Sequence, residues 1–373
     1  MSNILQSNYR CALGARQETL ELLKVSQTKQ SKRVIMGIEG EVEIPYCSFT
    51  NSQELSYEEI LEEIKEVVTP LLNSLTDTQK RSCCVVVGTS VIDLKIIESI
   101  ESSNYAYKRQ PYSSQKRSID SYAKDISDSF GLHGFTLTIN TACTSSANAL
   151  LEASNLIDEG IFEYVVVIGL EIFSNTLSSG FNAMQLLSSD HIKPFDKQRE
   201  GVVLGEAIVA TLLAKEPSKW SLLGGFSNCN GVNITSVSPE GEEYAEVMQE
   251  ALKKADLTAE DITLLKAHAT GTFSNDIAEI NAIERVFNKD IVFTAIKPYL
   301  GHTIGACGLL EMAVLIDCID AGFVPKTLNH KDPIIEDLQP LKEPMLCSEG
   351  TFMLNYFGFG GNNTSFIIQK GEL

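Results

Sequence analysis

The chain has 373 residues, of which 43% are hydrophobic and 21% charged, and its formal net charge is −19. This composition is typical of a soluble globular protein large enough for two domains or one duplicated unit. The negative charge argues against nucleic acid and anionic membranes as partners. No stretch reaches the ~18 consecutive apolar residues of a membrane span, and no signal peptide pattern opens the chain, so we expect a cytoplasmic protein. Nine cysteines without regular spacing argue against a disulfide framework, and we expect neither a metal nor another cofactor.

Apolar runs of strand length alternate with helical patterns along the whole chain, which predicts an α/β protein with largely covered sheets. Strands are expected at residues 84–89, 135–140, 163–169, 206–213, 220–228, 262–267, 291–296, 351–357 and 364–369. Helices are expected at residues 54–74, 142–158, 241–255, 276–287 and 304–321. The sequence Lys-Glu-Pro-Ser at residues 215–218 interrupts the pattern. We therefore divide the chain into an N-terminal half, residues 1–215, and a C-terminal half, residues 216–373.

Cys143 stands where an alternating, strand-like run ends and a helical pattern begins, within Thr-Ala-Cys-Thr-Ser-Ser at residues 141–146. Most free cysteines are simply small buried residues, and Cys84 and Cys318 fit that description. A thiol at a helix N-terminus, however, faces unpaired backbone amides, which lower its pKa and raise its thiolate fraction. Its position therefore favours Cys143 as a nucleophile.

Two histidines occupy similar positions in the C-terminal half. His268 lies in Lys-Ala-His-Ala-Thr-Gly-Thr at residues 266–272, and His302 in Lys-Pro-Tyr-Leu-Gly-His-Thr-Ile-Gly at residues 297–305. Each follows an apolar run and precedes a helical pattern. Near the C-terminus, Gly-Phe-Gly-Gly at residues 358–361 is a glycine-rich turn whose backbone amides could approach a ligand closely. With only five histidines in the chain, this recurrence indicates a catalytic site.

In this order, the four segments resemble those of the β-ketoacyl-acyl carrier protein synthases of the elongating type, which belong to the thiolase-like condensing enzymes. The similarity extends to residues 85–90, 194–206 and 365–368. It implies a five-layered αβαβα fold built from two similar halves. The same order of strand, loop and helix occurs around Cys143 and again around His302, which agrees with a duplicated fold. The part before Val85 is closer in style to ketosynthases of aryl-polyene pathways. Ala269 departs from the family pattern, which has glycine at that position.

The resemblance also implies the reaction and the roles of individual residues. Cys143 would take an acyl group from the phosphopantetheine of an acyl carrier protein, and His268 and His302 would promote decarboxylation of malonyl-carrier protein, so that the enolate attacks the thioester. Lys297 matches the family's catalytic lysine. Because a buried lysine needs a partner, we expect a carboxylate beside it, Glu311 first and Asp276 second. The backbone amides of Phe359 and Cys143 would form the oxyanion hole, with the Phe359 ring as a gate.

Three related functions remain as alternatives, each with a distinguishing residue. A non-catalytic chain-length factor lacks the nucleophile, a thiolase uses a second cysteine in its C-terminal loop, and the initiating condensing enzymes have asparagine in place of His302.

The resemblance implies a homodimer or a heterodimer with a ketosynthase-like subunit. Acyl carrier proteins are usually acidic, so docking to this acidic chain requires a basic patch. The candidates are Lys108, Arg109, Lys116, Arg117 and Lys124 in one island and Lys193, Lys197 and Arg199 in a second.

Overall fold

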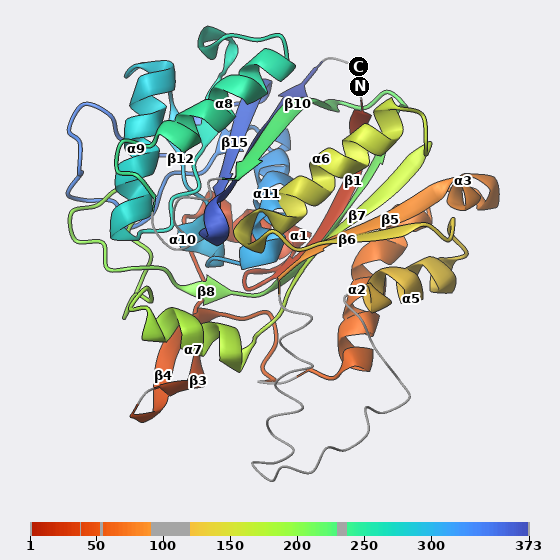
Figure 1. The fold of residues 1–373 in the computed structure, drawn as a ribbon, viewed down its shortest axis with the longest axis horizontal. Helices are drawn as coiled ribbons and strands as arrows, with labels where there is room; N and C mark the ends of the chain where they lie inside the picture. The colour runs from red at the N-terminus through yellow and green to blue at the C-terminus, as the bar shows by residue number, and fades with distance from the viewer. Residues whose placement is uncertain (1, 38, 53–54, 91–119, 230–236, 372–373) are drawn as a thin grey trace.

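The computed structural model describes residues 2–37, 39–52, 55–90, 120–229 and 237–371, and its main feature is one long mixed sheet (Figure 1). The first half contributes β1 (Ser2–Cys11), β5 (Cys83–Thr89), β6 (Thr136–Ile139), β7 (Tyr164–Glu171) and β9 (Ala207–Ala214). The second half contributes β10 (Trp220–Cys229), β11 (Leu264–Lys266), β12 (Phe293–Thr294), β15 (Gly350–Phe357) and β16 (Asn362–Lys370).

The strand order shows that the two halves are built alike. The sheet runs β12-β11-β15-β16-β10-β1-β9-β7-β5-β6. From the centre of the sheet outward, the strands of the second half follow the order β10-β16-β15-β11-β12, and those of the first half the order β1-β9-β7-β5-β6. If the five strands of each half are numbered along the chain, both halves have the same spatial order, 1-5-4-2-3. The two half-sheets join where β1 pairs antiparallel with β10. A duplicated architecture is therefore confirmed, whereas the domain boundary after residue 215 stays a prediction.

Helices cover both half-sheets and fill the space between them, giving five layers. The helices are α2 (Tyr57–Leu72), α5 (Ser121–Phe130), α6 (Ser145–Asp158), α8 (Glu242–Lys254), α9 (Phe273–Phe287) and α11 (Cys307–Asp320). Alternate residues of β5 and β7 pack outward against α2 and α5 and inward against α6 and α11, as the two-residue period of a strand requires. In the second half, α8 and α9 form the outer layer. Helix α11 is buried from Cys307 to Ile319 because it lies inside the molecule.

Each strand and helix predicted from the sequence is present, although several are shorter than expected, and the pattern missed other elements. The further described elements are β2 (Gly14–Ala15), α1 (Arg16–Lys24), β3 (Ser31–Gly37), β4 (Gly40–Cys47), α3 (Asp77–Arg81), α7 (Asn175–Ala183), β8 (Leu204–Gly205), α10 (Lys297–Leu300), β13 (Phe323–Val324) and β14 (Met345–Leu346). Strand β1 was missed because it is rich in polar residues, and one of these, Ser7, bonds Thr211 of β9 at 3.0 Å inside the sheet. A polar strand can be central when its side chains find such partners.

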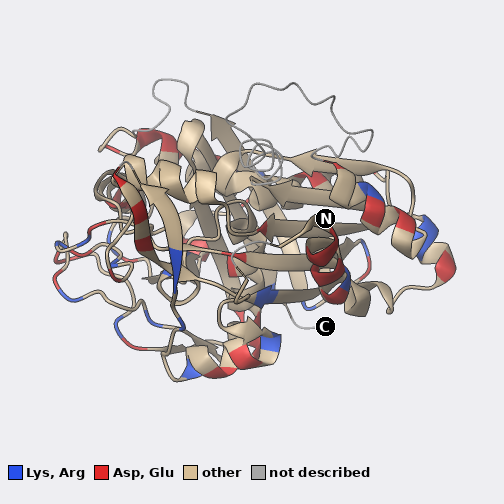
Figure 2. Cartoon of the chain, turned by 90° about the horizontal axis from the view of Figure 1, so that it is seen from below, with Lys and Arg blue, Asp and Glu red and all other residues tan. Residues whose placement is uncertain are grey.

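Charged side chains lie mostly on the outer helices and loops, whereas the strands of the sheet are mostly free of them (Figure 2). Helix α2 illustrates this distribution, since Ile60, Ile64 and Val67 are buried while its glutamates face outward. Within the described ranges, no helix is long and apolar enough to cross a membrane.

The close approach of α6 and α11 gives a first testable prediction. A Cβ atom at Gly308 would lie 2.4 Å from the backbone nitrogen of Ala147, and backbone cannot yield as a flexible side chain can. Gly308→Ala should therefore destabilise the protein by about 1–3 kcal/mol in urea unfolding. The control is Gly180→Ala in α7, where no atom lies within 4 Å and stability should stay the same or rise. Equal stability of Gly308→Ala and the wild type would contradict this packing.

Candidate active site

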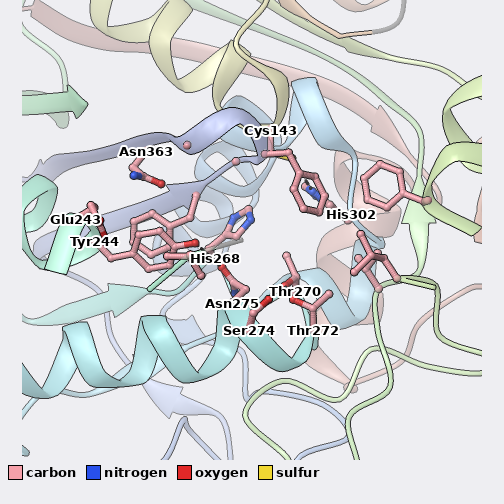
Figure 3. Close-up of a pocket in the computed structure, with 18 residues that line it drawn as sticks. Cys143, Glu243, Tyr244, His268, Thr270, Thr272, Ser274, Asn275, His302 and Asn363 are labelled. Atoms are coloured by element: carbon pink, nitrogen blue, oxygen red, sulfur yellow. Dashed lines mark hydrogen bonds between the residues drawn. The ribbon is translucent and has the colours of Figure 1, made fainter. Parts of the chain in front are cut away.

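Cys143 lies in a tight turn that joins β6 to α6. The turn is a short 3-10 helix, Ala142–Thr144, and Ala142 has a φ of +53°, a left-handed conformation unusual for alanine. Ser145 stabilises it, because its hydroxyl accepts a hydrogen bond from the Thr141 amide at 2.9 Å and donates one to the Ala142 carbonyl at 2.6 Å. The Cys143 side chain is only 2% exposed and lines a pocket (Figure 3).

Both predicted histidine loops meet at this pocket. His302 Nε2 lies 3.2 Å from Cys143 Sγ. The rings of His268 and His302 are nearly perpendicular, with centroids 5.5 Å apart, and both line the pocket with Cys143 (Figure 3). The structure thus brings to the Cys143 thiol two histidines, His268 and His302, that lie 125 and 159 residues further along the chain.

Lys297 contacts His268 and a carboxylate, as predicted. Its Nζ lies 2.7 Å from Glu311 Oε1 and 3.2 Å from His268 Nδ1. A lysine ammonium has only donors, so His268 Nδ1 must be the unprotonated acceptor. The ring proton of neutral His268 is therefore on Nε2.

The second candidate partner of Lys297, Asp276, has a different role. Its carboxylate accepts hydrogen bonds from the backbone amides of Phe195, at 2.7 Å, and Gly271, at 3.1 Å. Asp276 thereby ties the loop after His268 to a neighbouring segment. The partner of Lys297 is Glu311, and the Asp276 alternative is wrong.

Glu279, which was not predicted from the sequence, holds the His268 loop. Its carboxylate accepts hydrogen bonds from the backbone amides of His268, at 2.6 Å, and Ala269, at 2.7 Å. Ala269, which stands where the family has glycine, adopts a φ of +54°, a conformation that costs a residue with a Cβ about 1–2 kcal/mol. The paired bonds to Glu279 hold this strained turn. The sequence feature that could have indicated Glu279 is its position on the buried face of α9, where it shares a side of the helix with Ala282 and Ile283.

The protonation state of the thiol differs from the sequence-based prediction. Burial raises the pKa of Cys143 to about 11, although the backbone amide of Phe359 and the charge of Lys297 act in the opposite direction. The expected lowering of this pKa is therefore wrong, because loss of water outweighs the effect of the helix N-terminus. The thiol is protonated at neutral pH and must lose its proton when it reacts.

Both histidines are neutral in this environment. Burial, followed by the charge of Lys297, lowers the pKa of His268 and that of His302 well below the ordinary histidine value. Each neutral ring carries one N–H. The pocket can therefore offer hydrogen-bond donors to an oxygen atom without carrying extra charge on the rings.

Phe359 stands at the pocket beside the thiol. It begins a short 3-10 turn, Phe359–Gly361, between β15 and β16, in which Gly360 has a φ of +80°. Its ring makes an edge contact with Phe181 at 5.5 Å between centroids, and its backbone amide is directed at the Cys143 sulfur. The neighbouring Phe357 stacks on Tyr244 at 3.6 Å. Phe357 also lines the pocket, and the gate role of Phe359 stays a prediction.

The predicted docking residues are only partly described. Lys108, Arg109, Lys116 and Arg117 lie outside the described residues. Lys193 is partly exposed and lies 3.5 Å from Glu200. Lys124 pairs with Asp120, and Lys197 pairs with Asp332. Arg199 donates hydrogen bonds to the backbone carbonyls of Asp196, Thr272 and Phe273. Because Arg199 is also buried, it does not fit a docking role.

Comparisons with known proteins agree with this geometry. The model of the β-ketoacyl synthase N-terminal domain matches residues 61–218, and that of the C-terminal domain matches residues 221–331. The chain belongs to the β-ketoacyl synthase family. Its role is that of a condensing ketosynthase, an acyltransferase.

Relatives come from both fatty acid and polyketide synthesis. The 3-oxoacyl-[acyl-carrier-protein] synthase 2 of Vibrio harveyi is 28% identical over 79% of this chain and 77% of its own. The ketoacyl synthase alpha subunit of the tetracenomycin polyketide synthase of Streptomyces glaucescens is 29% identical, over 67% of this chain and 63% of its own.

Solved structures extend the similarity of fold to nearly the whole chain. The structure of a ketosynthase in complex with its chain length factor, from Xenorhabdus doucetiae, superposes with a TM-score of 0.87 at 22% identity, covering 99% of this chain and 98% of that one. At this identity the match concerns the fold, which is the thiolase-like fold of ketosynthases.

Proposed function

We propose that this ketosynthase elongates an acyl chain held on Cys143 by decarboxylative condensation with malonyl-acyl carrier protein. The observation that carries this proposal is the contact of His302 with the Cys143 thiol, at 3.2 Å, in a pocket that His268 also lines. In the first half-reaction, the Cys143 sulfur attacks the thioester of an acyl-carrier protein. The carrier's phosphopantetheine leaves as a thiolate and takes up the proton that Cys143 loses.

In the second half-reaction, malonyl-carrier protein occupies the same pocket. Its thioester oxygen accepts hydrogen bonds from the histidines, among them the Nε2–H of His268. The bond to the carboxylate breaks, carbon dioxide leaves, and the electron pair remains as an enolate whose charge these donors stabilise. The enolate carbon then attacks the Cys143 thioester, the carbon-sulfur bond breaks, and the backbone amides of Cys143 and Phe359 stabilise the oxyanion. The product is a β-ketoacyl-carrier protein.

Carrier protein and a second subunit are the proposed partners. One neighbouring solved structure is a ketosynthase in complex with a type II polyketide acyl carrier protein, and another is the complex with a chain length factor mentioned above. Among the strands that the structure describes, β6 lies at the end of the sheet, and an edge strand can pair its backbone groups with another chain. This supports a homodimer or a heterodimer with a ketosynthase-like subunit. Docking through the basic islands, an aryl-polyene pathway and a cytoplasmic location stay predictions.

The geometry favours a catalytic ketosynthase over a non-catalytic chain-length factor. Such a subunit has no use for a cysteine and two neutral histidines around one pocket, and here Lys297 and Glu311 also support His268. A thiolase is disfavoured because the turn Phe359–Gly361 offers no second cysteine at the pocket.

The proposal is tested by incubating the protein with malonyl-carrier protein and a panel of acyl-carrier proteins of different chain lengths. We expect release of carbon dioxide and, by mass spectrometry, a β-ketoacyl-carrier protein one malonyl-derived unit longer than at least one starter. Because the active form can require a ketosynthase-like subunit, the assay is run alone and with such a subunit. Absence of product under both conditions would refute the catalytic role.

A further inference from the structure

A second buried lysine, Lys266, lies close enough to His268 and His302 for its charge to act on both. The proposed reaction gives it no role. Lys266 ends β11, two residues before His268, and its side chain is fully buried. Its Nζ lies 2.6 Å from Glu311 Oε2, 2.9 Å from the Asn355 carbonyl and 3.7 Å from the centre of the Tyr356 ring. The ammonium is therefore completely coordinated by the protein, which indicates that the chain maintains a charge at this place.

Glu311 is shared between two ammonium groups. Lys297 binds its Oε1 at 2.7 Å and Lys266 its Oε2 at 2.6 Å. A carboxylate with both oxygens bound in this way cannot rotate without breaking a buried ion pair and leaving a buried charge unpaired, which is strongly unfavourable. Lys266 thus restrains Glu311, Glu311 restrains Lys297, and Lys297 contacts His268 Nδ1.

Charged and titratable groups approach Lys266 from several elements. Glu311 and Cys307 approach it from α11, Lys297 from α10, Tyr356 from β15 and Glu279 from α9. The Cys307 thiol is neutral because burial raises its pKa, and the Glu279 carboxylate is bound to the His268 and Ala269 amides. Lys266 and Lys297 are nevertheless both among the charges that lower the pKa values of His268 and His302.

We propose that Lys266 is a positioning residue, which locks Glu311 so that Lys297 keeps His268 in one orientation and which adds a second fixed positive charge beside both histidines. This inference rests on the proposed function, because it assigns Lys266 a part in the decarboxylation step. It requires Lys266 to be charged at the working pH. Burial lowers the pKa of Lys266 to about 8, against the attraction of Glu311, so the ammonium form predominates at pH 7.

The charge has a measurable consequence for the histidines. Burial, Lys297 and Lys266 together lower the pKa values of His268 and His302. Removal of a positive charge favours the protonated ring, so the pKa of each histidine should rise in a variant without Lys266. A protonated His268 can no longer accept from Lys297. Decarboxylation should then fail at a higher pH on the acidic side than in the wild type.

The kinetic test uses Lys266→Gln, which keeps a donor for Glu311 without the charge, and Lys266→Met, which removes both. We expect acylation of Cys143 to persist and malonyl-carrier protein decarboxylation at pH 6 to fall by about tenfold. This is less than the about 10²–10³-fold cost of removing a donor to the oxyanion, because Lys266 acts through Glu311 and Lys297. The acidic limb of the pH profile should move to higher pH. The control is Lys289→Gln, which removes a partly exposed lysine paired with Asp337. An unchanged pH profile in both Lys266 variants would overturn the proposal.

A second measurement does not depend on activity. The ring nitrogens of the five histidines are followed by NMR in protein labelled with ¹⁵N-histidine, with His268→Asn and His302→Asn for assignment. In the wild type, His268 should be neutral with its proton on Nε2 at pH 7, and in Lys266→Gln it should titrate at higher pH. Identical titrations would refute the role of Lys266. If Lys266→Gln shows this shift but the wild type does not decarboxylate malonyl-carrier protein, the proposed function fails and the positioning role stands.

Discussion

Cys143→Ser should abolish formation of the acyl-enzyme. The wild type incubated with an acyl-carrier protein should gain the mass of the acyl group, and the variant should gain none. A serine hydroxyl at this position is a far weaker nucleophile than the thiol, and condensation should fall by about 10³-fold or more. The measurement is intact-mass spectrometry followed by peptide mapping of the modified residue.

The matched control for this experiment is Cys229→Ser. Cys229 is the exposed thiol among the described cysteines and the one most open to non-specific acylation. Its replacement should leave the acyl mass on the protein. Acylation that survives in Cys143→Ser and disappears in Cys229→Ser would mean that Cys143 is not the nucleophile.

His302→Ala and His268→Ala should separate acyl transfer from decarboxylation. Each variant should still take an acyl group onto Cys143 but release carbon dioxide from malonyl-carrier protein about 10²–10³-fold more slowly, the usual cost of losing one donor to a developing oxyanion. In the wild type the low pKa values of both histidines keep the rings neutral as the pH falls below the ordinary histidine value. Wild-type decarboxylation should therefore persist at mildly acidic pH.

The control here is His191→Ala, which removes an exposed histidine paired with Asp190 and should leave both half-reactions unchanged. Acyl transfer and decarboxylation are measured separately, the first by intact mass and the second by carbon dioxide release. Normal decarboxylation in both single variants would show that the pair does not serve this step.

Local sequence pattern was sufficient to find the main side chains of the site. Cys143, His268 and His302 each stand between an apolar extended run and a helical pattern, and such a junction is visible in a short window of sequence. The need of a buried lysine for a counter-ion also led to Glu311, which binds Lys297. These features depend on neighbours along the chain or on a general rule about charge.

The pKa of the Cys143 thiol could not be predicted from the local sequence. The helix N-terminus beside Cys143 is local and was recognised, but the residues that exclude water from the sulfur come from distant segments, among them Phe181 and Phe359. Desolvation depends on this cover and is the larger effect, so the direction of the shift was predicted wrongly. The polar strand β1 was missed for a related reason, since its partners Thr211 and Trp220 lie more than 200 positions away.

The sequence by itself therefore determined the alternation of strands and helices, the candidate nucleophile and the two histidine loops. Only the tertiary structure decided which charges share a carboxylate and which groups lose their water. It paired Lys266 with the same glutamate as Lys297, and it assigned Glu279 to the amides of the His268 loop. The reason is physical: electrostatic and desolvation energies depend on distances in space and on the surrounding medium, and neither is encoded in the spacing of residues along a chain.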